Sequence, residues 1–210
     1  MSHSNPLFRR ISDLMYQLGP ARYYQPAYAQ IAQAIGLDDG VFLDVGCGPG
    51  WLCVHVGGGK PHVDAIGLDT SEQMVTYARR NKGPRLNVTI RKMDAMDIKF
   101  PEGTFDVAAA VQSAHHWEDT TRVLSEVHRV LKPGGRFLIY EAESGRSDVP
   151  TGWVERKRGW PPDSVVINGW KRFGMDDAEW AELEVKVRGV GFSNVVRDVH
   201  GFYRRMTLTK

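Results

Sequence analysis

Cysteine is scarce in this sequence, and long apolar runs are absent. Only 2 of the 210 residues are cysteines, and Cys47 and Cys53 lie around a glycine-rich stretch that a disulfide would distort. No metal-ligand cluster accompanies them, so we expect no bound metal. The apolar runs fall short of the about 18 residues that cross a membrane, and the amino terminus lacks a signal-peptide core. These absences indicate a protein of the reducing cytoplasm without a membrane segment.

A strong excess of positive charge is also absent. The 27 basic and 25 acidic residues give a formal net charge of +2. A protein that grips a nucleic-acid backbone needs a larger basic excess, so nucleic acid is not the expected partner. With 42% hydrophobic and 25% charged residues, the 210-residue chain has the composition and length of one globular domain, residues 1–210.

The most informative stretch is a short apolar run, Val41–Val45, that leads into glycines at three alternate positions. Gly46, Gly48 and Gly50 predict a strand that breaks into a tight turn, where the backbone can approach a nucleotide-like ligand. A second apolar run ends at Asp69, 19 residues after Gly50, at a position suited to accept hydrogen bonds from ribose hydroxyls. The spacing differs from the Gly-x-Gly-x-x-Gly of dinucleotide enzymes, so the ligand need not carry a pyrophosphate.

Strand and helix patterns alternate from residue 41 to residue 143, which predicts an α/β fold with a parallel sheet covered on both faces. The pattern predicts strands over 41–45, 62–69, 88–93, 106–112 and 136–140, and helices over 51–56, after Thr70 and over 120–131. Residues 132–135 are expected to stop the last of these helices. A closing helix after Asp176-Asp177, ended by Gly191, and two strands over 194–199 and 202–208 follow.

Four ordered motifs resemble those of the class I S-adenosylmethionine-dependent methyltransferases. They are the glycine stretch with its preceding Leu43-Asp44, then Met93-Asp94-Ala95, then Ser113–Trp117, and finally Glu126–Gly135. The resemblance is closest to the ubiquinone/menaquinone-biosynthesis-like branch that methylates small molecules. It implies a three-layer Rossmann-like sandwich whose seven-stranded, mostly parallel sheet ends in an antiparallel hairpin. It also implies four parts: an N-terminal helical cap (1–40), a cofactor-binding core (41–143), a lid insert (144–175), and a closing helix and hairpin (176–210).

The same resemblance assigns the cofactor, S-adenosyl-L-methionine, to residues at the strand ends. Asp44 and the Gly46 backbone would place its methionine end, Asp69 its ribose, and Met74 its adenine. Asp94 would accept from the exocyclic amine, the Ala95 N–H would donate to the ring, and Gln112 would lie near the sulfonium. The complete predicted binding set is Asp44, Gly46, Cys47, Gly48, Gly50, Asp69, Thr70, Met74, Asp94, Ala95 and Gln112.

Two adjacent histidines, His115 and His116, follow the fourth predicted strand and are the candidate catalytic residues. A histidine there could remove a proton from the methyl acceptor, since its pKa lies near neutrality. The alternative is that the pair braces the loop by hydrogen bonds, because methyl transfer depends first on alignment. The sequence does not distinguish His115 from His116.

Aromatic side chains supply the candidate contacts to the acceptor: Tyr23, Tyr24, Tyr28, Trp117, Trp153 and Trp160. We expect most of the tyrosines to pack N-terminal helices onto the sheet and one or two to face the pocket. Tryptophans alternate with arginines and lysines over residues 153–172. Such a segment favours a lid over a small molecule, with a core plug as the second interpretation and contact with single-stranded nucleic acid as the third.

The sequence thus predicts transfer of a methyl group from S-adenosylmethionine to an O, N or C atom of a small molecule, by a monomer or homodimer. An RNA or protein methyltransferase is the alternative within the same class. A non-catalytic, cofactor-binding regulator is the alternative from another class. A nicotinamide oxidoreductase is disfavoured by the glycine spacing and by the terminal hairpin.

Overall fold

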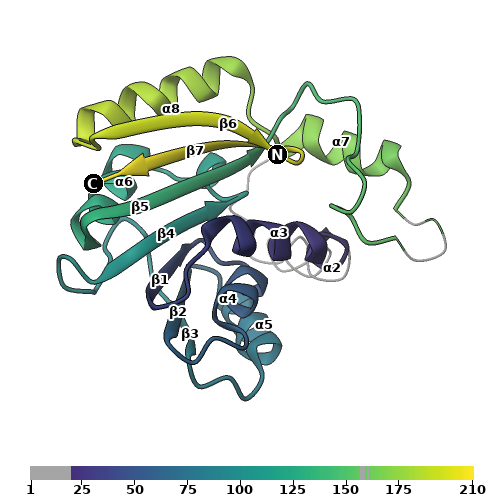
Figure 1. Ribbon diagram of the computed structural model, residues 1–210. Helices are drawn as coiled ribbons and strands as arrows, with labels where there is room; N and C mark the ends of the chain where they lie inside the picture. Colours follow the sequence, from purple (N-terminus) through teal and green to yellow (C-terminus); the bar gives the residue numbers. More distant parts are fainter. Residues whose placement is uncertain (1–19, 157–158, 160) are drawn as a thin grey trace.

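The computed structural model describes residues 20–156, 159 and 161–210, and its centre is one seven-stranded sheet (Figure 1). The strand order is β3-β2-β1-β4-β5-β7-β6, and β7 runs antiparallel to both of its neighbours while the other pairs are parallel. The strands are β1 (Gly40–Val45), β2 (Val63–Asp69), β3 (Val88–Lys92), β4 (Phe105–Val111), β5 (Leu131–Ala142), β6 (Asn194–His200) and β7 (Tyr203–Thr209).

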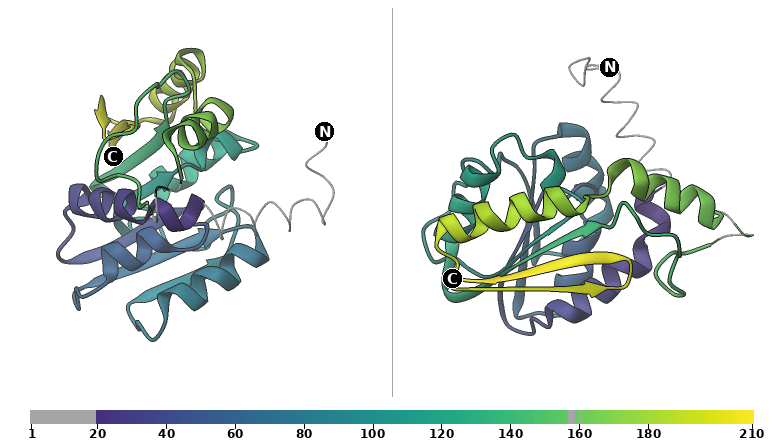
Figure 2. Two further views of the ribbon diagram at one scale, coloured as in Figure 1. Left: turned by 90° about the vertical axis from the view of Figure 1, so that its right-hand side faces the viewer. Right: turned by 90° about the horizontal axis from the view of Figure 1, so that it is seen from above.

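Helices cover both faces of this sheet. The described helices are α2 (Pro20–Tyr23), α3 (Gln25–Ile35), α4 (Trp51–Gly57), α5 (Glu72–Lys82), the 3-10 turn η1 (Ala114–His116), α6 (Thr120–Val130), α7 (Asp163–Phe173) and α8 (Asp177–Val190). One apolar core joins α3, α4 and α5 to the sheet, and a second joins α6 and α8 to its other face (Figure 2). Helix α7 lies beyond the carboxyl ends of β4 and β5 in both figures. None of the helices in the described ranges is long and apolar enough to span a membrane.

The predicted three-layer fold is confirmed, and local sequence explains several of its element boundaries. The side chain of Ser71 accepts the Met74 N–H and begins α5. Asp176 and Glu179 form a reciprocal capping box that begins α8, and Gly191 ends that helix in a left-handed conformation. Helix α4 has only 7 residues, as the run of glycines from Gly57 predicts.

One predicted boundary was wrong, and one helix was not predicted. Helix α6 ends at Val130, before residues 132–135 as expected, but the next strand does not begin at Arg136, because β5 begins at Leu131, directly after the helix. The register between β4 and β5 shifts between Phe105 and Val107, and this irregularity absorbs the extra residues within the strand. Helix α7 was not predicted, since a β-branched run and an internal Gly169 are unfavourable for a helix.

Candidate functional site

The glycine turn after β1 adopts the conformation that its sequence predicts. Gly46, Gly48 and Gly50 have φ angles of 72°, 50° and 78°, which side chains rarely adopt. A Cβ on Gly46 would lie 2.7 Å from the Cβ of Ser113, so the fold itself requires a glycine there. A Cβ on Gly48 would meet no described atom within 4 Å. Space therefore opens in front of Gly48, whereas Gly46 is enclosed by the protein.

Asp69, at the end of β2, holds this turn in place. Its Oδ2 accepts the Gly48 N–H at 2.8 Å, and its Oδ1 accepts the Ser71 N–H at 2.8 Å. The carboxylate thus lies at the rim of the turn, where a ribose hydroxyl is expected.

The remaining adenosine-side candidates lie around the ends of β2 and β3. Met93 donates its N–H to the Asp69 carbonyl oxygen at 3.1 Å, which brings the two strand ends together. Asp94 is exposed and accepts the Met96 N–H at 2.8 Å, while Ala95 is half-buried between them. Thr70 is exposed beside Asp69, and Met74 is buried in the first turn of α5. Their contacts with the cofactor stay predictions.

Asp44, on β1 beneath the glycine turn, is a buried carboxyl group that is only 2% exposed. Its pKa is raised to about 7, mainly by burial and also by the negative charge of Asp69. The Cys53 thiol acts in the opposite direction, because it donates a hydrogen bond to the Asp44 carboxylate at 3.5 Å. Cys47 and Cys53 are both buried free thiols, and burial raises the pKa of each. The strand beneath the turn therefore carries a carboxyl group whose ionised form a cationic ligand would favour.

The end of β4 lies against the glycine turn. Ser113 donates its hydroxyl to the Val45 carbonyl oxygen at 2.7 Å. Gln112 has a left-handed φ of 54°, unusual for a residue with a side chain, and its N–H donates to the Tyr140 carbonyl oxygen at 2.8 Å. The Gln112 Nε2 is buried and has no hydrogen-bond partner among the described residues. Strained backbone and an unpaired buried amide are features that concentrate at functional sites.

The two histidines differ in their surroundings. His115 Nδ1 lies 2.8 Å from Oε2 of Glu141, a carboxylate on β5 that is 0% exposed. The other oxygen of Glu141 accepts the Ala114 N–H at 2.7 Å. His116 is exposed, and its ring lies 3.9 Å from the ring of His115, centroid to centroid.

Segments from distant parts of the chain meet beside the strand ends. The Glu155 N–H donates to the Tyr23 carbonyl oxygen at 2.7 Å, which ties the 144–175 segment to α2. Tyr24 packs on Tyr23 and on Phe202 of the β6–β7 turn, with ring centroids 5.1 and 5.5 Å apart. Trp153 is buried and lies 5.8 Å from Phe202, centroid to centroid.

The structure thus shows aromatic packing between the N-terminal helices, the 144–175 segment and the hairpin. Tyr28, on α3, is buried in the core, as expected for most of the tyrosines, whereas Tyr23 and Tyr24 are half-buried. Trp117 stacks on Phe137 on the α6 side of the sheet. Trp160 lies outside the described residues. Contact between any of these rings and an acceptor stays a prediction.

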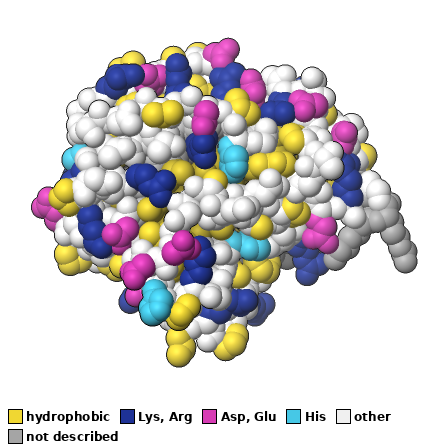
Figure 3. Space-filling model, viewed as in Figure 1, with side chains coloured by type: hydrophobic (Ala, Val, Ile, Leu, Met, Phe, Trp, Pro, Cys, Tyr) yellow, Lys and Arg dark blue, Asp and Glu magenta, His cyan; other side chains and the backbone are white. Residues whose placement is uncertain are grey.

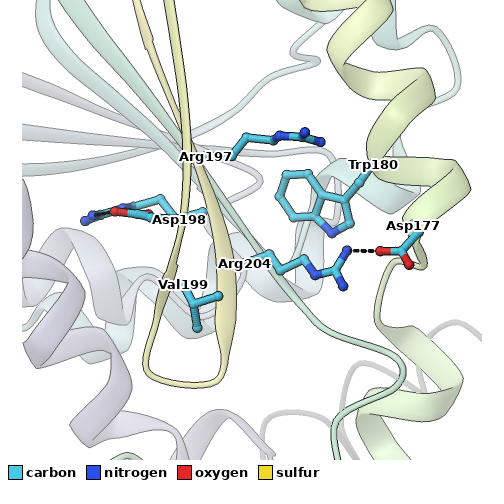
Figure 4. A pocket seen from close by; sticks show the side chains of 7 residues that line it. Asp177, Trp180, Arg197, Asp198, Val199 and Arg204 are labelled. Carbon is cyan, nitrogen blue, oxygen red and sulfur yellow. Dashed lines mark hydrogen bonds and ion pairs between the residues drawn. The ribbon is translucent and has the colours of Figure 1, made fainter.

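A surface pocket of about 310 Å³ lies elsewhere, between α8 and the β6–β7 hairpin (Figure 4). Each of its three arginines forms an ion pair. Arg197 pairs with Glu184, and Arg205 pairs with Asp198. Arg204 pairs with both Asp177 and Glu143. Since carboxylates already neutralise all three, we assign no anion site to this pocket.

Known protein families support the interpretation of the strand ends. Residues 43–139 match the family model described as a methyltransferase domain. This core is therefore similar in sequence to methyltransferase domains, and its fold is that of the class I S-adenosylmethionine-dependent methyltransferases. Demethylmenaquinone methyltransferase of Symbiobacterium thermophilum is 39% identical over 104 residues, 48% of this chain and 41% of the relative. Sterol 24-C-methyltransferase of Aspergillus fumigatus is 34% identical over 117 residues, 53% of this chain and 30% of the relative.

A solved structure from Methanococcus maripaludis, described as belonging to the S-adenosyl-L-methionine-dependent methyltransferases, shares the fold with a TM-score of 0.75. It is 20% identical and covers 100% of this chain and 97% of its own. The methyltransferase fold that the sequence motifs implied is therefore confirmed. The chain spans less than half of the two curated relatives described above, at 41% and 30% of their lengths.

Sequence reasoning missed two polar residues that connect the strand ends, Ser113 and Glu141. Ser113 lay within a recognised motif, but its role depends on contact with β1, far away in the sequence. Glu141 carried a usable signal, since an acid directly after the apolar run Phe137–Tyr140 is unusual in a central strand. Its partners on η1 follow only from the pairing of β4 with β5.

Proposed function

We propose that this protein transfers a methyl group from S-adenosylmethionine to a small acceptor that binds between the strand ends and the 144–175 segment. The observation that carries the proposal is the loop geometry: three left-handed glycines, open space at Gly48 and the Asp69 carboxylate at its rim. Ligands of such α/β folds bind beyond the carboxyl ends of the parallel strands, which is where these groups meet.

The residues present fit S-adenosylmethionine. When bound, the cofactor supplies an electrophilic methyl group on a sulfonium. Asp69 would accept hydroxyl hydrogen bonds, and the carboxyl group of Asp44 would face a cationic methionine end. The unpaired Gln112 amide would face the reacting centre. Alignment by such fixed groups supplies much of the rate enhancement in a two-substrate reaction.

A small acceptor is favoured over RNA or protein. The relatives at 39% and 34% identity are described as methyltransferases of demethylmenaquinone and of sterols, which are both small molecules. Cationic and anionic side chains are interspersed on the face drawn in Figure 3, and the whole chain has a net charge of only +2. We further propose a monomer or homodimer in the cytoplasm, where thiols such as Cys47 and Cys53 stay reduced.

Calorimetry with S-adenosylhomocysteine, the product form of the cofactor, tests the cofactor site. We expect a dissociation constant in the micromolar range, about −7 to −8 kcal/mol. Asp69→Asn should weaken binding by about 1–3 kcal/mol, because it removes a charge-assisted acceptor from the rim. Asp64→Asn, at an exposed position on the same strand, is the matched control and should bind normally. No heat with folded wild-type protein would refute the proposal.

Methyl transfer itself is tested by production of S-adenosylhomocysteine with panels of small quinols, phenols and sterols, beside bulk RNA and denatured protein. Turnover with a small molecule alone supports the proposal. Turnover only with RNA or protein would establish the alternative within the same class. Cofactor binding without turnover on any panel would favour a regulator that senses the cofactor.

A further inference from the structure

We propose that Glu141 is a positioning residue that holds the proton of neutral His115 on Nδ1, so that Nε2 of His115 accepts the proton of the methyl acceptor. This inference rests on the proposed methyl transfer. It goes further in choosing between the two histidines and in assigning a role to a carboxylate outside the sequence motifs.

The first argument is the geometry of the Glu141 carboxylate. Its Oε1 accepts the Ala114 N–H at 2.7 Å, and its Oε2 lies 2.8 Å from Nδ1 of His115. A carboxylate only accepts hydrogen bonds, so the proton between Glu141 and His115 belongs to Nδ1. In neutral His115 the second nitrogen, Nε2, then carries a lone pair and no proton.

The second argument is burial. Glu141 is 0% exposed and His115 has a side chain that is 15% exposed, so both lie in a region where charge interactions are strong. A buried carboxylate needs compensation, and here one backbone N–H and one imidazole N–H supply it. The carboxylate is thereby fixed, and it fixes the imidazole in turn.

The charged surroundings favour proton uptake by His115. Burial alone lowers the pKa of His115, but the hydrogen bond and the charge of Glu141 from β5, with Glu179 of α8 adding to them, raise it above its usual value. The ring of His116, another titratable group, lies 3.9 Å from the ring of His115, centroid to centroid. An imidazolium formed at His115 would be balanced by Glu141 across the shared hydrogen bond.

The chemical step conserves atoms and charge. The nucleophilic atom of the acceptor, an O–H or N–H group, uses its lone pair to bond to the methyl carbon, and the carbon–sulfur bond breaks with its electron pair left on sulfur. The acceptor proton passes to Nε2 of His115. His115 becomes the imidazolium that Glu141 stabilises, and solvent removes this proton after the product leaves.

Glu141→Gln is the decisive variant because it keeps the size of the side chain and reverses the direction of its hydrogen bond with Nδ1 of His115. The amide oxygen must stay on the Ala114 N–H, so the NH₂ group faces Nδ1 and donates to it. Neutral His115 is then forced into the other tautomer, with its proton on Nε2. Glu179→Gln is the matched control: it removes the other nearby carboxylate, while glutamine still serves the capping box of α8.

The tautomer is read by nitrogen NMR of ¹⁵N-histidine protein, with His115 assigned by its replacement and with S-adenosylhomocysteine bound. We expect a protonated Nδ1 in neutral wild type and in Glu179→Gln, and a protonated Nε2 in Glu141→Gln. Exchanging S-adenosylhomocysteine for S-adenosylmethionine, without an acceptor, should lower the pKa of His115, because the proposed site brings the positive charge of the sulfonium toward its ring.

Two outcomes would overturn the inference: a wild-type His115 with its neutral proton on Nε2, or a pKa that is the same with either ligand. Both measurements use wild-type protein, so the inference stays falsifiable even where Glu141→Gln does not fold. An unchanged tautomer in folded Glu141→Gln would equally count against it. In each of these three outcomes the ligand is bound, so the proposed function would still stand. Absence of ligand binding would refute the proposed function together with the role of Glu141 and His115.

Discussion

The buried carboxyl group of Asp44 makes the stability of this protein depend on pH in a direction opposite to that of most acidic residues. Its pKa is raised from 3.8 to about 7, mainly by burial. The folded state therefore holds the proton more tightly than the unfolded state. The stabilisation is fully present below the unfolded pKa and is lost as the pH rises through the folded pKa.

The size of the effect follows from the shift. A rise of about 3 units corresponds to about 4 kcal/mol between the acidic and alkaline limits. Between pH 4.5 and pH 7.5 the linkage relation gives a loss of about 3 kcal/mol in unfolding free energy. Asp44→Asn resembles the neutral acid in shape and does not titrate, so it should lack this loss. The difference between the two proteins isolates Asp44 from every other titrating group.

The assay is urea denaturation of wild type and Asp44→Asn at several pH values from 4.5 to 8.5. We expect the variant to gain about 3 kcal/mol relative to wild type from pH 4.5 to pH 7.5, and nothing more above that range. Saturating S-adenosylhomocysteine should reduce the gain, because the proposed function places an ammonium group near this carboxylate. If the difference in unfolding free energy between wild type and Asp44→Asn changes by less than about 0.5 kcal/mol over this pH range, the raised pKa of Asp44 is refuted.

Two further predictions concern glycines, each with a control at another left-handed glycine. Gly48→Ala should destabilise the folded protein by only about 1 kcal/mol, yet it should weaken binding of S-adenosylhomocysteine at least about tenfold. Gly46→Ala should mainly destabilise the folded protein, because its Cβ would lie 2.7 Å from the Cβ of Ser113. Calorimetry and urea denaturation separate the two, and normal affinity of Gly48→Ala would contradict the close approach. Gly201→Ala places a Cβ 2.2 Å from the Trp153 ring, so it should lower the free energy of unfolding by about 2–4 kcal/mol. The control, Gly103→Ala, has the same φ and no neighbour within 4 Å, and should lower it by about 1 kcal/mol. Equal unfolding free energies for the two variants would refute this prediction.

The sheet and the glycine turn were predictable because their signals are local. Apolar runs that end at Val45 and Asp69 mark strand ends, and alternate glycines leave few conformations for the turn between strand and helix. Parallel strands bring their carboxyl ends to one edge, so the neighbourhood of Gly48 and Asp69 followed without coordinates. The hydrogen bond between them is the contact that this reasoning implies.

The segments around the strand ends were less predictable, because their contacts link residues far apart in sequence. Helix α7 forms over residues whose intrinsic helix propensity is low, so tertiary context overrides local preference there. Trp153 gave an ambiguous signal among cations, and only the hairpin turn at Gly201 and Phe202 explains its burial. The choice between the histidines likewise depended on Glu141, which the sequence separates from His115 by 26 positions.

A common device connects the strand ends that form the site. In each case a polar side chain from one strand end satisfies a backbone group of the neighbouring one: Asp69 binds the turn after β1, Ser113 binds the end of β1, and Glu141 binds the turn after β4. A lost bond of this kind leaves a backbone donor or acceptor without its partner, which costs more than the bond contributes. The loops are therefore fixed before any ligand binds, as methyl transfer requires when alignment is its main source of rate. It follows that substitutions at these three residues should change the positions of neighbouring loops. Substitution of Asp69 or Glu141 should also change the protonation of a neighbouring side chain, Asp44 or His115, whereas substitution of Ser113 should not.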